Sequence, residues 1–279
     1  MSRNDVFSAA ASDPRVAETL EQAQQELGFD IPVETVPLPS LGKAYPPEHP
    51  LHLKNSVDIR AMTAREEDIL TSRAFIKNGT VITNLLRSCL VDKSIDPRTL
   101  LSGDRNAILV AIRITGYGAD YNTNVTCPVC GTTQIHACSL SELPIRSLEV
   151  DPIAPGNNEF EVVLPVSGKK VTLSFPTGID EEEALTIAER KRKQGIVADN
   201  LVTERLFRAI TSIQGNPDKA HISKFVRNMP ARDSLEIRRF LEKREPTVDM
   251  VTHFACEACD NQEEMPLPMG ANFFWPSAL

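Results

Sequence analysis

The sequence predicts an α+β fold with a helical N-terminal block, a β unit split into two cysteine-bearing knuckles, and an inserted subdomain of one hairpin and several helices. Three observations predict it. Apolar residues recur at helical spacing in two separate stretches, 81–114 and 201–241. Short alternating segments flank two Cys-x-x-Cys pairs that lie far apart in the chain. A third alternating pair of segments, 160–164 and 171–175, surrounds a Ser-Gly-Lys-Lys turn, which is typical of a hairpin.

Composition and charge limit the class of protein. The 279 residues are 41% hydrophobic and 24% charged, and no apolar run approaches the ~18–20 residues that a membrane helix needs. Because no apolar stretch follows the first residues, no secretory signal is expected, and we expect an intracellular, soluble chain without a membrane partner. The net charge is −8, and residues 248–279 hold five acidic and no basic side chains. Since nucleic-acid binding needs a basic patch, the charge argues against that partner.

The first predicted unit is residues 1–54, a helix followed by a proline-rich arm. Asp13-Pro14 is a helix start, and an apolar stripe runs to Leu27; this helix docks either on a partner or on the periphery of its own fold. Six prolines in 31–50 exclude a helix or a central strand and predict an extended segment. Since a pure linker needs no large apolar residues, the arm is interpreted as a partner contact made by Leu38, Leu41 and Tyr45.

Residues 55–120 are predicted to form a helical block around the first core. A short strand over 57–61 precedes Thr63-Ala64-Arg65-Glu66, the pattern of a capping box. Helices are then expected through Leu70, over 81–90, and from a cap at Asp104 to a stop at Gly116.

The two cysteine pairs predict a metal site. Each pair, Cys127/Cys130 and Cys256/Cys259, lies between two alternating segments. A Cys-x-x-Cys turn directs two thiolates at one point, and two such turns make the tetrahedral four-sulfur site that Zn²⁺ prefers. The 125 residues between Cys130 and Cys256 far exceed the usual spacing of about 15–20. The sequence therefore predicts a split zinc ribbon over 121–150 and 248–272, interrupted by a subdomain over 151–247.

Other interpretations of the cysteines remain open at this point. One alternative is a disulfide within or between the pairs, and another is that the pairs never meet. A third is a thiol-disulfide oxidoreductase, which would need a helix after the first cysteine to lower its pKa. Strand-like residues flank both pairs, which argues against that enzyme. Since the sequence also lacks a phosphate loop, a His-Glu-x-x-His pair and a Gly-x-Ser-x-Gly elbow, we expect no enzyme and no small-molecule substrate.

The inserted subdomain and the tail complete the prediction. After the hairpin, four helices are expected over 180–193, 201–213, 218–229 and 231–243. The last segment, 273–279, contains Phe273, Phe274 and Trp275, although chain ends are normally polar. These aromatics are interpreted as a second partner contact; the alternative is that they fold back onto their own chain.

Several strings in fixed order carry a family resemblance. They are 36–46 (VPLPSLGKAYP), 62–70 (MTAREEDIL), 101–108 (LSGDRNAI), 115–118 (TGYG), the two knuckles and 273–276 (FFWP). Together they resemble the baseplate (hub) assembly proteins of contractile-tailed, T-even-like bacteriophages. The resemblance implies a structural or assembly component of a phage tail baseplate, made in the host cytoplasm and located in the virion tail, which acts by contacts with other baseplate or tail proteins. The alternative from another class is a zinc-ribbon protein that binds nucleic acid.

Overall fold

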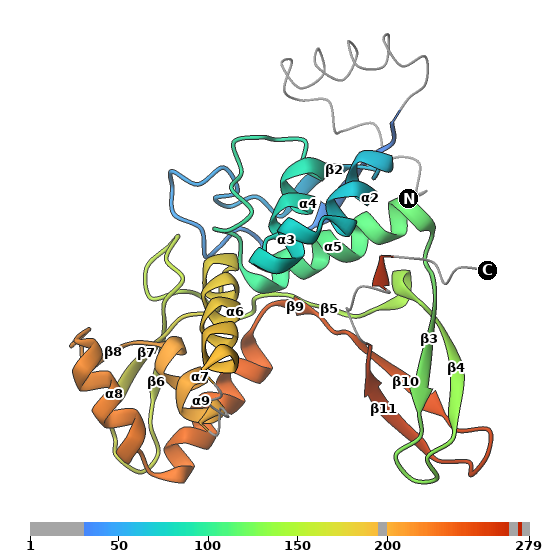
Figure 1. Cartoon of the computed structure of the whole chain (residues 1–279). Helices are drawn as coiled ribbons and strands as arrows, with labels where there is room; N and C mark the ends of the chain where they lie inside the picture. Colours follow the sequence, from blue (N-terminus) through green and yellow to red (C-terminus); the bar gives the residue numbers. More distant parts are fainter. Residues whose placement is uncertain (1–30, 195–199, 268–272, 275–279) are drawn as a thin grey trace.

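The computed structural model describes residues 31–194, 200–267 and 273–274, which form a mixed α+β fold with eight α-helices and small antiparallel sheets. Figure 1 shows three parts: a helical body, a second helical unit beside a small sheet, and a finger of four strands. The helix predicted from Asp13-Pro14 lies outside the described residues. In the described ranges, no helix is both long and apolar enough to cross a membrane.

The body combines a two-stranded sheet with four helices. β1 (Val33–Pro37) pairs with β2 (Ser56–Arg60), and the helices are α2 (Ala64–Thr71), α3 (Arg73–Asn78), α4 (Val81–Cys89) and α5 (Ser102–Tyr117). The predicted capping box at the start of α2 is confirmed. α5 starts two residues before Asp104 and ends at Tyr117, followed by the C-cap residue Gly118, whose φ is 85°. Asp104 is therefore not the N-cap but a buried residue of the first turn. Its carboxylate does not cap the helix and can accept hydrogen bonds from another segment.

The proline-rich arm packs against the body, which corrects the predicted partner contact for two of its three residues, Leu38 and Tyr45. Ser40 donates from its N–H (2.9 Å) and its hydroxyl (2.5 Å) to the Asp104 carboxylate, and the Tyr45 hydroxyl donates to the same group at 2.5 Å. Leu38 and Tyr45 are only 1% and 2% exposed, so neither is available to a partner. Leu41 is half-buried. The reason is that a buried carboxylate needs donors, and the arm supplies three of them.

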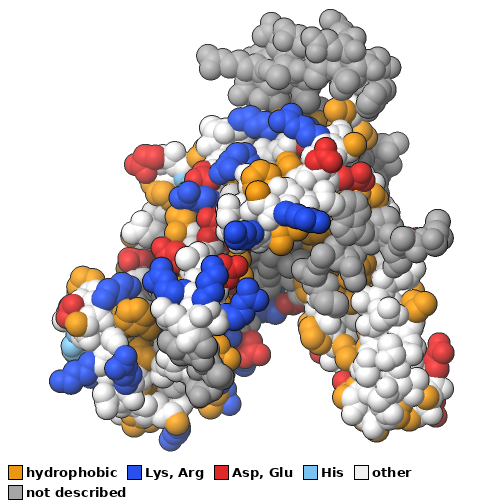
Figure 2. All heavy atoms as spheres, viewed as in Figure 1, with side chains coloured by type: hydrophobic (Ala, Val, Ile, Leu, Met, Phe, Trp, Pro, Cys, Tyr) orange, Lys and Arg blue, Asp and Glu red, His pale blue; other side chains and the backbone are white. Residues whose placement is uncertain are grey.

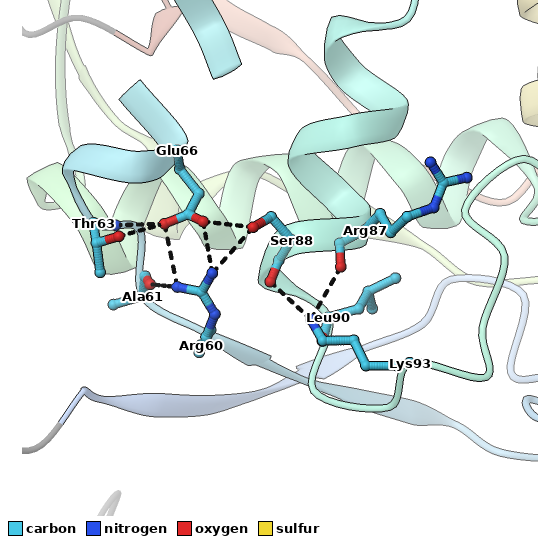
Figure 3. Close-up of polar contacts among 8 residues, drawn as sticks. All are labelled: Arg60, Ala61, Thr63, Glu66, Arg87, Ser88, Leu90 and Lys93. Atoms are coloured by element: carbon cyan, nitrogen blue, oxygen red, sulfur yellow. Dashed lines mark hydrogen bonds and ion pairs between the residues drawn. The ribbon is translucent and has the colours of Figure 1, made fainter. Parts of the chain in front are cut away.

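A buried ion pair joins β2, α2 and α4 (Figure 3). The Glu66 carboxylate, whose side chain is fully buried, accepts two hydrogen bonds from the Arg60 guanidinium, at 2.6 and 3.2 Å. It also accepts from the Thr63 amide and hydroxyl and from the Ser88 hydroxyl. Nearby, the Lys93 ammonium donates to three backbone carbonyls at the end of α4. These contacts fix the strand that bears the arm to the helices beneath it.

The second helical unit contains the predicted hairpin. β6 (Phe160–Val163), β7 (Lys170–Leu173) and β8 (Ile210–Ile213) form a sheet in that order, with α6 (Gly178–Lys193), α7 (Leu201–Ala209), α8 (Lys219–Asn228) and α9 (Ala231–Arg244). The helix predicted over 201–213 is wrong in its last part: residues 210–213 pair with β7 and bury both isoleucines. Asp180 does not cap α6; Thr177 does, and Asp180 is its capping-box partner.

Four strands form the finger. β3 (Asp120–Thr126) pairs with β4 (Thr133–Ser139), and β10 (Val251–Ala255) pairs with β11 (Gln262–Pro266). At its base, after the 3-10 turn Leu140–Glu142, β5 (Ile145–Arg146) pairs with β9 (Thr247–Val248). This pair lets the chain leave and re-enter at one place. One hydrophobic core runs through the body and the second helical unit, whereas a separate small core lies in the finger.

Candidate metal centre

Both knuckles have the same turn. In each, the first cysteine donates its N–H to the carbonyl five residues on, and its own carbonyl accepts the N–H four residues on. The bonds are Cys127–Thr132 (2.9 Å), Gly131–Cys127 (2.9 Å), Cys256–Asn261 (2.8 Å) and Asp260–Cys256 (3.1 Å). The fifth turn residue is left-handed in both, Gly131 with φ 74° and Asp260 with φ 54°, a conformation that glycine and aspartate tolerate best. This shared turn directs both sulfurs of a pair to one side.

The structure brings the two pairs together. The four Sγ atoms of Cys127, Cys130, Cys256 and Cys259 lie within 4.8 Å of one another. Two distances across the knuckles are 3.7 Å (Cys127–Cys259) and 3.6 Å (Cys130–Cys256). A tetrahedron with zinc–sulfur bonds of about 2.3 Å has sulfurs about 3.8 Å apart, whereas a disulfide needs about 2.0 Å. The cysteines are free, and their spacing fits a tetrahedral metal ion.

A small interface holds the two ribbons in this arrangement. Val125, Phe254 and Met265 pack with the two buried sulfurs between the ribbons. The Gln134 amide donates to the Ala255 carbonyl at 2.9 Å and accepts from the Glu257 amide at 3.0 Å, so one side chain bridges both ribbons. Gln134 was not predicted from the sequence, although strand alternation places it on the same face as His136.

The electrostatics of the sulfurs favour a cation. Hydrogen bonds from the Thr132 hydroxyl and amide, helped by neighbouring sulfurs, lower the pKa of Cys130 to about 6. The Asn261 amide lowers the pKa of Cys259, but hydrogen bonds to the neighbouring sulfurs outweigh it and raise that pKa to about 12. Once one thiol ionises, the others resist ionisation because like charges repel. A divalent cation removes this conflict, since thiolates are the form that binds metal.

The other candidate ligands lie outside the cluster. Cys89 is buried in the body, where it packs as a small hydrophobic residue, and burial raises the pKa of its thiol to about 12. Cys138 on β4 donates to the Tyr121 carbonyl at 3.6 Å, and His136 bonds Thr252 at 3.0 Å. Within the described ranges, the four knuckle cysteines are the only group of metal-ligand type that converges.

Phe273 and Phe274 pack on their own chain, which corrects the predicted partner contact at these two positions. Phe273 is fully buried and Phe274 is 4% exposed; the Phe273 ring meets the Tyr121 ring edge-on at 5.4 Å. Trp275 lies outside the described residues. Buried Arg113 explains the packing, because its guanidinium donates to the carbonyls of Phe273 (2.9 Å), Gly118 (2.6 Å) and Asp120 (3.1 Å). Sequence reasoning missed Arg113, whose only signal is a charge on the apolar face of α5.

A closed cluster of four thiols in an α+β chain is typical of proteins with a structural rather than a catalytic metal site. The comparison with known families supplies the identity: the model of the T4 bacteriophage base plate protein family matches residues 33–275. The match covers most of the 279 residues, so this chain belongs to that family, as its sequence resemblance predicts. Among curated proteins and among solved structures, none matches it.

Proposed function

We propose that this protein is a structural or assembly component of a phage tail baseplate that acts through protein–protein contacts and holds a structural Zn²⁺ ion. The ligands of this ion are Cys127, Cys130, Cys256 and Cys259. The observation that carries the proposal is the convergence of these four sulfurs, from knuckles 125 residues apart, in a member of the base plate family. The protein is made in the host cytoplasm and acts in the virion tail.

The zinc ion has a structural task in this proposal. Four thiolates fill the tetrahedron and leave no position for water or substrate, so the ion supplies folding energy instead of chemistry. It joins residues 121–150 and 248–272 as one split ribbon around the inserted subdomain 151–247. The β5–β9 pair at the base of the finger supports this division, because the inserted segment leaves and returns there. Residues 55–120 form the helical block on which both units are carried.

The experiment that tests the function is a mass-spectrometric census of purified phage particles and tail intermediates. We expect the protein in baseplates at a fixed ratio to other baseplate proteins, and an absence of baseplates when its gene is disabled. If it leaves before the particle matures, it will be present in intermediates and missing from virions, which identifies an assembly factor. Its absence from both fractions would refute the proposal.

The alternative of a nucleic-acid-binding zinc ribbon has less support. The ribbons over 121–139 and 251–267 contain no Lys or Arg, whereas contact with phosphates needs several. A thiol oxidoreductase needs a helix N-terminus at the reactive cysteine, and both knuckles lie between strands.

A further inference from the structure

Helices α8 and α9 present a basic surface. Residues 219–244 contain eight basic and three acidic side chains, and one acid, Asp233, is buried and accepts the amides of Val166 and Ser167. In the described parts of the chain, six exposed cations of these helices form no ion pair: Lys219, Lys224, Arg227, Arg232, Arg239 and Lys243. Figure 2 shows blue side chains gathered over this unit. Unpaired cations on a folded surface are suited to an acidic partner.

The finger has the opposite charge. Its two ribbons, 121–139 and 251–267, contain no Lys or Arg and four acidic residues, all exposed: Glu257, Asp260, Glu263 and Glu264. All four lie on the β10–β11 ribbon or its turn. The tip also exposes an apolar side chain, Val129, which is 68% exposed between Cys127 and Cys130. An apolar centre beside a charged rim is the usual composition of a protein interface.

The unit that contains α8 and α9 also exposes apolar side chains, which could pack against Val129 at the tip of the finger. Val163 and Val166 are 57% and 53% exposed, and Val166 is hydrogen-bonded to Asp233 near the start of α9, next to Arg232. In Figure 1 the finger and the α8–α9 unit project separately from the body. The body therefore keeps the two surfaces of one chain apart. Because the surfaces have opposite charges, each matches the other surface of a second copy.

We propose that the finger of one copy docks on the α8–α9 surface of a second copy. The contact is heterologous, because different surfaces meet, and such contacts build closed rings or open filaments. This proposal rests on the proposed function, because self-association would be one of the protein–protein contacts through which the protein acts. It needs no other phage protein, so purified protein can test it separately.

The test measures self-association of the full-length protein by sedimentation velocity over a range of concentrations at low and high salt. Two double variants reverse one surface each. Arg232→Glu with Arg239→Glu makes the helix surface acidic, and Glu at position 232 suits the first turn of α9. Glu257→Lys with Glu264→Lys makes the finger basic. The matched control reverses two exposed cations elsewhere, Lys54 and Lys77, to Glu.

We expect wild-type protein and the control to self-associate at low salt and to dissociate as salt rises, because exposed charges are screened. Each double variant alone should self-associate about tenfold or more weakly, since like charges then face each other. An equimolar mixture of the two should recover association, because every finger again meets a helix surface of opposite charge. Circular dichroism and zinc content show that each variant is folded.

Three results would overturn the proposal: wild-type protein that stays monomeric at every concentration, double variants that associate as the control does, or a mixture that stays monomeric. Wild-type protein that stays monomeric but binds DNA or anionic vesicles would assign the basic surface to those partners instead. In each case the census of phage particles still decides the proposed function, so the two failures are distinguishable.

Discussion

Replacing Glu66 by Gln tests whether the buried ion pair stabilises the body. The carboxylate is fully buried and accepts five hydrogen bonds, two of them from Arg60. Burial alone would raise its pKa, but the bonds from Arg60, Ser88 and Thr63 outweigh burial and lower the pKa to about 2, from an ordinary value of 4.5. That difference corresponds to about 3 kcal/mol of folding free energy in favour of the ionised form.

The sign of the pH dependence follows from the lowered pKa. The contribution is complete above pH 4.5, where the unfolded chain also ionises this group, and is lost as the pH falls from 4.5 towards 2. We therefore expect Glu66→Gln to lower the free energy of unfolding by about 3 kcal/mol at pH 7. The deficit relative to wild type should shrink below pH 4.5.

Urea unfolding at pH 7 and at pH 3, followed by circular dichroism, measures this difference. Asp68→Asn is the matched control, since Asp68 is an exposed acid on the same helix; its effect should stay within about 0.5 kcal/mol. A Glu66→Gln protein as stable as wild type at pH 7, or a deficit unchanged at pH 3, would refute the reasoning.

Three further predictions concern the finger, the tail and the arm. Cys256→Ser should abolish tight zinc binding and lower the melting temperature, whereas Cys138→Ser should retain one zinc by atomic emission; equal zinc in both would contradict the assignment. Phe273→Ala should cost about 3–5 kcal/mol in urea unfolding, because it empties a fully buried site, and a loss under 1 kcal/mol would indicate that the tail packs elsewhere. Tyr45→Phe leaves the buried Leu101 N–H without its 3.0 Å acceptor and should cost about 1–3 kcal/mol; an unchanged stability would place the arm off the body.

Local signals predicted most of the elements. The capping box at Thr63 and the hairpin around Gly168 each depend on residues within a few positions, and both are confirmed. The convergence of the cysteines was also predictable, because each Cys-x-x-Cys turn is half of a tetrahedron that needs the other half.

Contacts across long separations were not predictable from one sequence. Ser40 meets Asp104 64 positions away, and Arg113 meets Phe273 160 positions away. Apolar residues beside prolines or at a chain end can pack either on a partner or on their own chain. The sequence does not distinguish the two, because the buried groups that bind these segments, Asp104 and Arg113, lie far away in the chain. Residues 210–213 likewise continue the helical pattern of the residues before them. They form a strand because they pair with the edge of β7 that β6 does not use.

The claim that one zinc ion holds two distant knuckles together is tested most directly by X-ray absorption at the zinc edge of the purified full-length protein, with metal content measured on the same sample. We expect one zinc per chain, surrounded by four sulfurs at about 2.3 Å. Folded protein without zinc, or zinc bound by nitrogen or oxygen ligands instead of the four cysteines, would contradict the account.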